Sequence, residues 1–201
     1  MEERISSKPF IRPSRESAYI RGLRKLRNVE TSGPIRTGGD RVKICVISDT
    51  HTGSIDDLHR RLLDELSSVD MIIHAGDFTS KPLLDALRKI GPFKGVYGNI
   101  DGPEVRKELP ETDIVQMAGF KIGVNHPAEG GSPLTLEQRL RPKLPGVQAI
   151  IHGHSHRTKN DFRDGVLWFN PGSATGKFPA TKKTYGILTI NKEIRGEIIT
   201  L

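Results

Sequence analysis

Five short polar segments of this sequence carry side chains that are good metal ligands. Each segment follows a run of apolar residues, and together they offer carboxylate, amide and imidazole donors. This set exceeds what one four-coordinate ion uses and suits two adjacent ions, and paired ions catalyse phosphoester hydrolysis. The segments are Asp49-Thr50-His51, Gly76-Asp77, Gly98-Asn99-Ile100-Asp101, Asn125-His126 and Gly153-His154-Ser155-His156.

The spacing within these segments favours metal binding. Side chains two residues apart on extended backbone point to the same side, so Asp49 and His51 can bind one ion. The same spacing in the last segment supplies the imidazoles of His154 and His156. Asp77 has two carboxylate oxygens and could bridge two ions. Any one of these motifs arises by chance, but their joint occurrence after apolar runs favours a metal centre over a purely structural explanation.

Three further histidines fit structural roles better. His59 falls in a helical stretch, where we expect it on the surface. His74 and His152 lie inside apolar runs, so we expect buried histidines that support the centre rather than bind an ion.

Apolar runs and helical patterns alternate in the first half of the chain. They predict strands at Val42–Ile47, 70–74 and 93–97, and helices at 55–66 and 82–90. This alternation predicts right-handed crossovers and a parallel sheet. The polar segments would then emerge at the carboxyl end of that sheet, where open α/β folds bind ligands.

The second half is richer in strands. Hairpin turns are predicted at Ala118-Gly119, Asp164-Gly165 and Asn191-Lys192-Glu193, with a buried strand at 147–151 and a helical segment at 134–140. This half should supply a second, mixed sheet packed on the first. The predicted fold class is α/β, a two-sheet β-sandwich flanked by helices in a four-layer αββα arrangement.

Length and composition indicate a single domain. A chain of 201 residues with 35% hydrophobic residues can bury one good core. No apolar run approaches a bilayer span and the N-terminus lacks a secretory signal, so we expect a cytoplasmic protein without a membrane partner. Cys45 is the only cysteine, which excludes an intrachain disulfide and a thiolate metal site.

The positive charge is concentrated at the N-terminus. Of the net charge of +7, residues 1–40 contribute nine Lys/Arg against five Asp/Glu, and the other 161 residues contribute 22 against 19. We interpret residues 1–40 as a basic extension and linker, and residues 41–201 as the domain. Within the extension, apolar residues recur at helical spacing between basic ones, a pattern that could contact nucleic acid, an acidic partner or the domain itself. These residues are Ile20, Leu23, Leu26 and Val29.

The order of the five segments resembles that of the calcineurin-like metallophosphoesterase superfamily. The similarity is greatest to its small single-domain bacterial and archaeal phosphodiesterase branch. Phe169-Asn170-Pro171-Gly172-Ser173 also resembles a turn that is common in that branch. The resemblance covers residues 42–201 and leaves the first 40 unexplained.

This resemblance implies a binuclear metal centre. The ligands of one ion would be Asp49, His51, Asp77 and His156. Those of the other would be Asp77, Asn99, His126 and His154, with Asp77, Asn99 and His126 also assigned to catalysis. The cofactors would be two divalent transition-metal ions, manganese in the first place, with nickel, iron or zinc as alternatives. A hydroxide that bridges the ions would attack phosphorus in line with the leaving group.

One position departs from many phosphomonoesterases of the superfamily. They carry a histidine after the Gly-Asn, placed to protonate the leaving group, and here the residue is Ile100. Diesters with stabilised leaving groups depend least on such an acid, so the sequence favours a phosphodiesterase that acts on a small or exposed phosphodiester. Asp101 and water are the candidates for the acid.

Two other functions are compatible with the resemblance. One is a non-catalytic scaffold for protein partners, like the retromer subunit that shares this fold, although such scaffolds typically lack some of the imidazoles. The other is a nuclease recruited to nucleic acid by the basic N-terminal segment. The sequence leaves the oligomeric state open.

Overall fold

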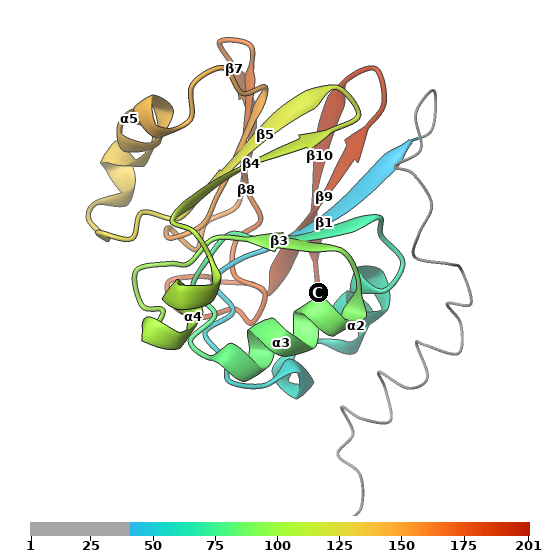
Figure 1. Ribbon diagram of the computed structural model, residues 1–201, viewed down its shortest axis with the longest axis vertical. Coiled ribbons are helices and arrows are strands. Elements are labelled where there is room, and N and C mark those ends of the chain that lie inside the picture. Colours follow the sequence, from blue (N-terminus) through green and yellow to red (C-terminus); the bar gives the residue numbers. More distant parts are fainter. Residues whose placement is uncertain (1–40) are drawn as a thin grey trace, which may run out of the picture.

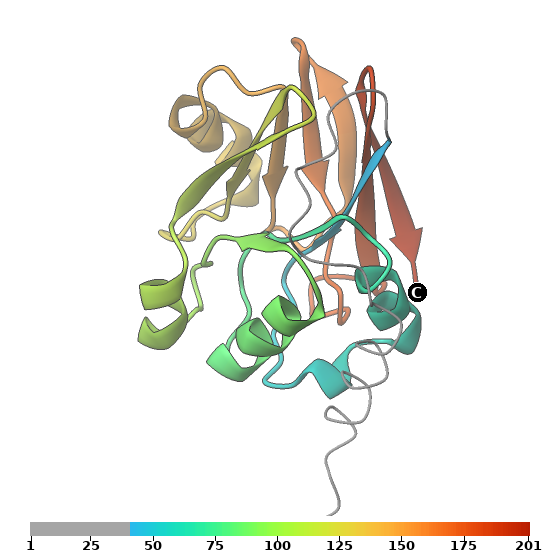
Figure 2. The same ribbon diagram turned by 45° about the vertical axis from the view of Figure 1, so that its right-hand side comes forward.

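The computed structural model describes residues 41–201 as two β-sheets with helices on their outer faces (Figures 1 and 2). The basic extension predicted for residues 1–40, with its helical pattern, lies outside the described residues. Within residues 41–201, no helix combines the length and apolar character that crossing a membrane requires.

The first sheet consists, in spatial order, of β10 (Ile194–Thr200), β9 (Thr184–Ile190), β1 (Val42–Ile47), β2 (Met71–His74) and β3 (Phe93–Gly95). The strands β1, β2 and β3 run parallel, as predicted. The carboxyl ends of these three strands therefore lie at the same edge of the sheet.

The C-terminal hairpin corrects the predicted division of strands between the sheets. The sequence pattern predicted this hairpin in the second sheet, but β9 pairs antiparallel with β1, and Cys45 lies opposite Ile187. The first sheet is therefore mixed rather than parallel. The prediction failed because alternation along a hairpin specifies its two faces but not the sheet edge that it extends.

The second sheet consists, in spatial order, of β4 (Thr112–Met117), β5 (Phe120–Asn125), β6 (Ala149–His152), β8 (Val166–Asn170) and β7 (Lys159–Arg163). Its central strands β5, β6 and β8 are parallel, and the edge strands β4 and β7 pair antiparallel with their neighbours. The predicted mixed sheet and the first two predicted hairpins are confirmed.

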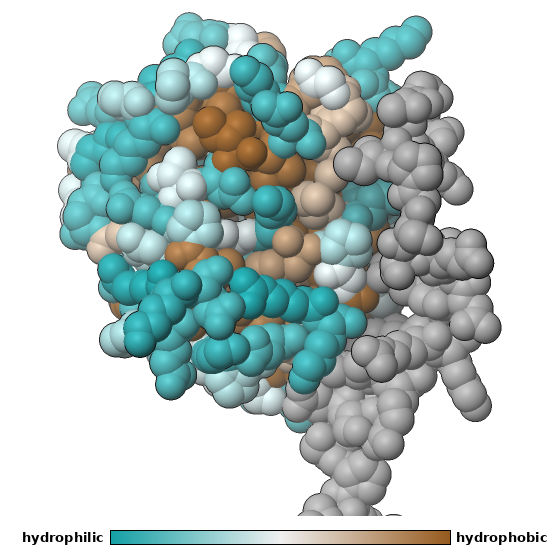
Figure 3. Space-filling model, viewed as in Figure 1, coloured by the Kyte–Doolittle hydropathy of each residue, from teal (hydrophilic) through white to brown (hydrophobic). Residues whose placement is uncertain are grey.

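Within residues 41–201, four α-helices cover the outer faces of the sheets, which confirms the αββα arrangement. The helices α2 (Arg60–Leu66), α3 (Lys81–Ile90) and α4 (Pro103–Glu108) belong to the layer on the first sheet, and α5 (Leu136–Leu140) covers the second. Figure 3 shows that the helical lower part of this face is mostly hydrophilic, whereas hydrophobic residues gather further up.

The strand β1 shows how the sequence separates these layers. Ile44 and Val46 point into the core between the sheets, where they pack in one cluster with Val124 and Phe169. Cys45 is fully buried in the other core, beneath the helices. Successive side chains of a strand point to opposite faces, so an apolar run without alternation is what a strand covered on both faces requires.

Two helical predictions need correction. The helix predicted at 55–66 is a 3-10 turn, Ile55–Asp57, followed by α2. His59 lies between them on the surface, as expected, and its Nδ1 accepts the Arg61 N–H at 3.2 Å, which begins the second helix. The helix α4 was not predicted, although Pro103 after Gly102 is a typical helix start.

Candidate metal centre

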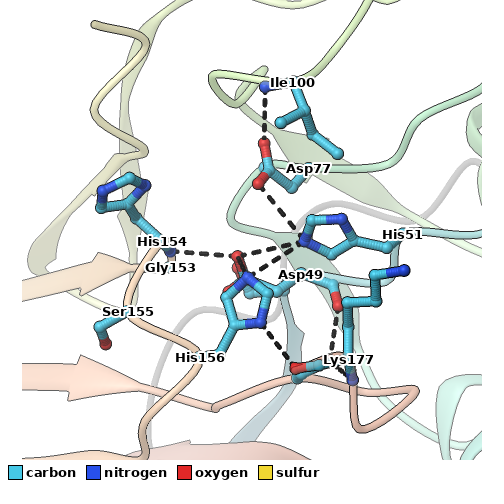
Figure 4. A network of polar contacts seen from close by, with 12 residues as sticks. Asp49, His51, Asp77, Ile100, Gly153, His154, Ser155, His156 and Lys177 are labelled. Atoms are coloured by element: carbon cyan, nitrogen blue, oxygen red, sulfur yellow. Dashed lines mark hydrogen bonds and ion pairs between the residues drawn. The ribbon is translucent and has the colours of Figure 1, made fainter. Parts of the chain in front are cut away.

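Loops from both sheets meet at one end of the sandwich and bring the predicted ligands together. Residues 48–52 follow β1, residues 75–79 follow β2 and residues 96–101 follow β3. From the second sheet, His126 follows β5 and residues 153–156 follow β6. Figure 4 shows the side chains of Asp49, His51, Asp77 and His156 pointing toward one another.

Four of the predicted ligands form one compact group. One ligand atom from each of Asp49, His51, Asp77 and His156 lies within 4.8 Å of all the others. His156 Nε2 is 3.2 Å from Asp49 Oδ1, and His51 Nε2 is 3.1 Å from His156 Nε2. These are the four residues that the resemblance assigns to the first ion.

The other three predicted ligands form a second group that also lies next to Asp77. Asn99 Oδ1 is 3.1 Å from His126 Nε2 and 3.0 Å from His154 Nδ1. Asp77 Oδ2 is 3.4 Å from His126 Nε2 and 3.5 Å from His51 Nε2. One carboxylate oxygen therefore lies near both groups.

Three of the imidazoles are oriented by backbone carbonyls. A carbonyl only accepts, so the ring nitrogen that faces it carries the hydrogen, and in a neutral imidazole the other nitrogen offers a lone pair. In each case that second nitrogen faces the ligand groups. The pairs are His126 Nδ1 with Ala75 O at 2.7 Å, His154 Nε2 with Gly131 O at 2.8 Å, and His156 Nδ1 with Lys177 O at 2.8 Å.

The donor set fits divalent metal ions. With these ring hydrogens placed, the His126 and His154 lone pairs and Asn99 Oδ1 are acceptors that face one another without a hydrogen between them. Asp49 Oδ2 is buried and has no hydrogen-bond partner among the described residues. Burying an unpaired anionic oxygen is unfavourable unless a cation compensates it. Bound ions would satisfy all of these atoms.

The backbone of the ligand loops differs from the predicted one. Asp49 and His51 converge, but with φ of 49° and 45° rather than in extended conformation. The left-handed conformation also occurs at Asp77, His154 and His156. Backbone hydrogen bonds enforce it, since the Asp49 N–H donates to Gly76 O and the His51 N–H to Asp77 O. Strained non-glycine residues of this kind cluster at functional sites.

Burial and neighbouring charges shift the pKa values at the centre. Burial alone would raise the pKa of Asp77, but the hydrogen bond and charge of His126 lower it. Burial alone would lower the pKa of His126 and His156, but Asp77 and Asp49 respectively stabilise the protonated forms of these imidazoles in the metal-free centre, which raises the pKa. For His51 burial prevails and the pKa is lowered. The two carboxylates thus create a negative potential that attracts cations.

Asp101 holds the loops in place instead of facing the ligand groups. Its Oδ2 accepts the Asp77 N–H at 3.0 Å and the Gly98 N–H at 2.7 Å, and its Oδ1 accepts the Thr79 N–H at 2.8 Å. Burial raises its pKa, although these N–H groups oppose the shift. Both carboxyl oxygens are engaged, which makes Asp101 a poor candidate for the acid.

The segment after β8 also supports the centre, a role that the sequence analysis missed. Ser173 Oγ donates to Asp49 O at 2.7 Å, and Thr175 Oγ1 donates to Thr50 O at 2.7 Å. Lys177 supplies the carbonyl that orients His156 and lies beside the group in Figure 4. The signal was present, because this polar turn follows an apolar strand as the five ligand segments do.

The two histidines inside strands are buried, as expected, and the supporting role is clear for His74. Its Nδ1 accepts the Gly76 N–H, so its Nε2 carries the hydrogen and donates to Thr50 Oγ1 at 3.1 Å. Thr50 Oγ1 in turn donates to Asp77 O. His152 Nδ1 lies 3.2 Å from Asn170 Nδ2, and burial lowers the pKa of this imidazole to about 4.

Comparison with known proteins identifies the family. The model of the calcineurin-like phosphoesterase superfamily domain matches residues 42–193. A probable metallophosphoesterase of Methanocaldococcus jannaschii is 39% identical over 141 residues, which are 68% of this chain and 70% of that protein. A phosphodiesterase of the same archaeon is 28% identical over 171 residues, which are 79% and 99% of the two chains. The chain belongs to the calcineurin-like phosphoesterase superfamily.

Solved structures share the architecture. An archaeal phosphodiesterase aligns with a TM-score of 0.65 and 26% identity, over 80% of this chain and 100% of that one. Vacuolar protein sorting 29 from Cryptosporidium parvum aligns with a TM-score of 0.64 and 21% identity, over 80% of this chain and 98% of that one, and this likeness concerns the fold alone. The predicted family and fold class are confirmed.

Proposed function

We propose that the chain is a phosphodiesterase that uses two divalent metal ions. The observation that carries this proposal is the position of Asp77 Oδ2, which lies 3.5 Å from His51 Nε2 and 3.4 Å from His126 Nε2. A carboxylate oxygen between two groups of metal-ligand donors is what a bridged pair of ions requires. The names of the archaeal relatives, metallophosphoesterase and phosphodiesterase, support the same chemistry.

Each ion has its own residues in this proposal. One would be held by Asp49, His51, Asp77 and His156, and the other by Asp77, Asn99, His126 and His154. Such ions, when bound, activate water as a nucleophile and neutralise charge that develops on the phosphoryl oxygens. Mixed imidazole, carboxylate and amide ligands suit manganese first, and nickel, iron or zinc as alternatives.

Two residues beside Asp77 favour diesters over monoesters. The Ile100 N–H donates to Asp77 Oδ1 at 3.2 Å, which leaves Oδ2 directed at the imidazoles. The Ile100 side chain is 44% exposed and offers no proton to a leaving group. Asp101, the nearest alternative, has both oxygens engaged by backbone N–H groups. We therefore infer that diesters with stabilised leaving groups are cleaved fastest, and that water supplies the proton to less stable leaving groups such as a ribose oxygen.

The test combines metal analysis with hydrolysis of an aryl diester. We expect two ions per chain by mass spectrometry of the metals, and metal-dependent hydrolysis of bis(p-nitrophenyl) phosphate. Asp77→Asn should lower kcat/KM on the order of 10³-fold, because the bridge loses its charge. The matched control is Asp85→Asn on α3, whose carboxylate contacts Lys81. Wild-type activity in Asp77→Asn would contradict the proposal.

The two alternative functions make different demands. A scaffold for protein partners has no need of a complete donor set, so convergence of all seven donors favours catalysis. A nuclease recruited by residues 1–40 would bind nucleic acid in a salt-sensitive way that deletion of those residues abolishes. If the protein were such a scaffold or such a nuclease, its partner or substrate would differ from the proposed one, but the fold assignment would stay the same.

A further inference from the structure

A pocket lies directly beside the candidate metal centre. Its volume is about 430 Å³, within the range of small-molecule sites, and His156 forms part of its wall. His156 also belongs to the first ligand group, with Nε2 at 3.2 Å from Asp49 Oδ1. The imidazole of His156 therefore lies between this pocket and the metal centre, where the proposed function places the scissile phosphate.

The loop on the other side of the pocket is also fixed to the centre. Lys177 O accepts the Nδ1 hydrogen of His156 at 2.8 Å, and the Lys177 N–H donates to Ser173 Oγ at 2.9 Å. The chain then continues to Thr181 and Lys182, which line the pocket. The hydrogen bonds of Lys177 to His156 and Ser173 therefore fix the pocket wall relative to the metal centre, so one molecule could contact both.

The charges of this pocket are one-sided. Among residues 41–201, Arg157 and Lys182 line it, and no Asp or Glu does. Both side chains are exposed, and within residues 41–201 neither takes part in an ion pair, a property that they share with other basic residues such as Arg141 and Lys192. Unpaired cations that face a pocket attract an anionic ligand, and guanidinium and ammonium groups suit phosphate.

The uncharged walls suit an organic group that carries such an anion. Thr158 and Thr181 line the pocket, and their hydroxyls form no hydrogen bond within the described residues. Ile198 and Pro179 add apolar surface. Hydroxyl donors beside apolar surface recognise a sugar or a ring rather than a bare ion.

We propose that this pocket binds a second phosphate group of the substrate, carried on the organic group next to the scissile diester. The preferred substrate class is then a phosphodiester with a further phosphate, such as a 5′-phosphorylated dinucleotide. Arg157 and Lys182 bind the second phosphate, and Thr158 and Thr181 bind the group that carries it. This inference rests on the proposed phosphodiesterase function and specifies its substrate.

A kinetic comparison tests the pocket separately from the metal centre. Two substrates are compared, the diadenosine dinucleotide ApA and its 5′-phosphorylated form pApA. The metal-loaded wild type should cleave pApA with a kcat/KM about tenfold above that of ApA, because the 5′-phosphate makes two additional charge-assisted contacts. Arg157→Ala/Lys182→Ala should reduce this preference to about one. The matched control, Arg141→Ala/Lys192→Ala, removes the same charge from exposed positions outside the pocket and should keep the preference.

The outcomes separate the two proposals. Equal rates for pApA and ApA in the wild type, or a preference that survives Arg157→Ala/Lys182→Ala, would overturn the pocket assignment. The phosphodiesterase function itself would be overturned if the wild type cleaved none of the three substrates, bis(p-nitrophenyl) phosphate, pApA and ApA. A preference lost equally in the control variant would show that long-range charge, not the pocket, selects pApA.

An equilibrium measurement gives a readout that is independent of turnover. Zinc-loaded protein is titrated calorimetrically with adenosine 3′,5′-bisphosphate and with inorganic phosphate. The Kd for the bisphosphate should rise about tenfold in Arg157→Ala/Lys182→Ala, whereas the Kd for inorganic phosphate should change far less. Equal weakening of both ligands, or of neither, would overturn the assignment. Thermal unfolding of each variant verifies that the fold is intact.

Discussion

The two ends of the sandwich use left-handed backbone conformations differently. At the hairpin end, φ is positive at Ala118 and Gly119 and at Asp164 and Gly165, the central residues of two-residue turns. Such turns require this conformation, and glycine adopts it without strain. At the metal end the same conformation falls on Asp and His side chains. The ligands with positive φ there are Asp49, His51, Asp77, His154 and His156, and Thr79 beside them shares this conformation.

This difference shows what each end is built for. The hairpin end takes its residue types from the geometry of the turns. The metal end keeps carboxylates and imidazoles in a conformation that costs about 1–2 kcal/mol per residue, because the chemistry requires those groups. The compensation must come from elsewhere, and bound ions supply it in the proposed state. The two ends should therefore respond differently to the same kind of perturbation.

Metal removal should have the largest effect, and mainly at the metal end. Chelation should abolish hydrolysis of bis(p-nitrophenyl) phosphate. It should also lower Tm, because an ion present at a free concentration of about 1,000 times its Kd stabilises the folded state by about 4 kcal/mol. Hydrogen exchange should accelerate at residues 48–52 and 153–156. The turns at 118–119 and 164–165 serve as the internal control. If exchange accelerated equally there, metal would not stabilise the metal end selectively.

A methyl group added at each end should sharpen the comparison. A Cβ at Gly98 would overlap the Asp77 carboxylate and its backbone nitrogen, so Gly98→Ala should lower kcat/KM about 10²-fold by displacing the bridge. A Cβ at Gly119 meets nothing within 4 Å, although φ is 85°. Gly119→Ala should leave activity within about twofold and lower the free energy of unfolding by about 1 kcal/mol. Similar activities in the two variants would refute this account.

His152 should make the metal end sensitive to acid. Burial lowers its pKa from 6.5 to about 4, so the unfolded chain takes up the proton first. The associated stability is complete above pH 6.5 and is lost as the pH falls toward 4, by about 2–3 kcal/mol. In metal-free protein, His152→Gln should reduce the difference between urea unfolding free energies at pH 7.5 and 4.5 by that amount. The exposed His59→Gln control should leave it unchanged.

Deletion of residues 1–40 should have the smallest effect on catalysis. All seven donors lie between residues 49 and 156, so hydrolysis of bis(p-nitrophenyl) phosphate should stay within about twofold of wild type. A large loss of activity would show that the extension contributes to the centre. Salt-dependent binding to nucleic acid that disappears with the deletion would support the nuclease alternative.

The sequence predicted the positions of the ligand loops because the signal is local. An apolar run that stops at Asp49 or at Asp77 predicts a buried strand and its polar end without knowledge of the rest of the chain. Parallel strand order then brings those ends together. The layers were predictable for the same reason, since strands such as β1 are apolar on both faces.

What the sequence did not predict depends on distant contacts. The pairing of β9 with β1 places Lys43 opposite Thr189, and no local pattern specifies that edge. The left-handed conformation of Asp49 depends on a hydrogen bond to Gly76 O from the next strand end. The orientation of His154 by Gly131 O, across a loop, is equally invisible to residue spacing.

Both sheets contribute donors to the centre: four lie on loops of the first sheet, among them Asp49 and Asp77, and three on loops of the second, among them His126 and His156. Ions bound between them would act as a removable cross-link. They would join chain segments as distant as residues 51 and 156, much as a disulfide does, in a protein whose single cysteine can form none within the chain. Separation of the two sheets at this end would then require the ions to leave, so the lifetime of the folded state would depend on how slowly metal dissociates.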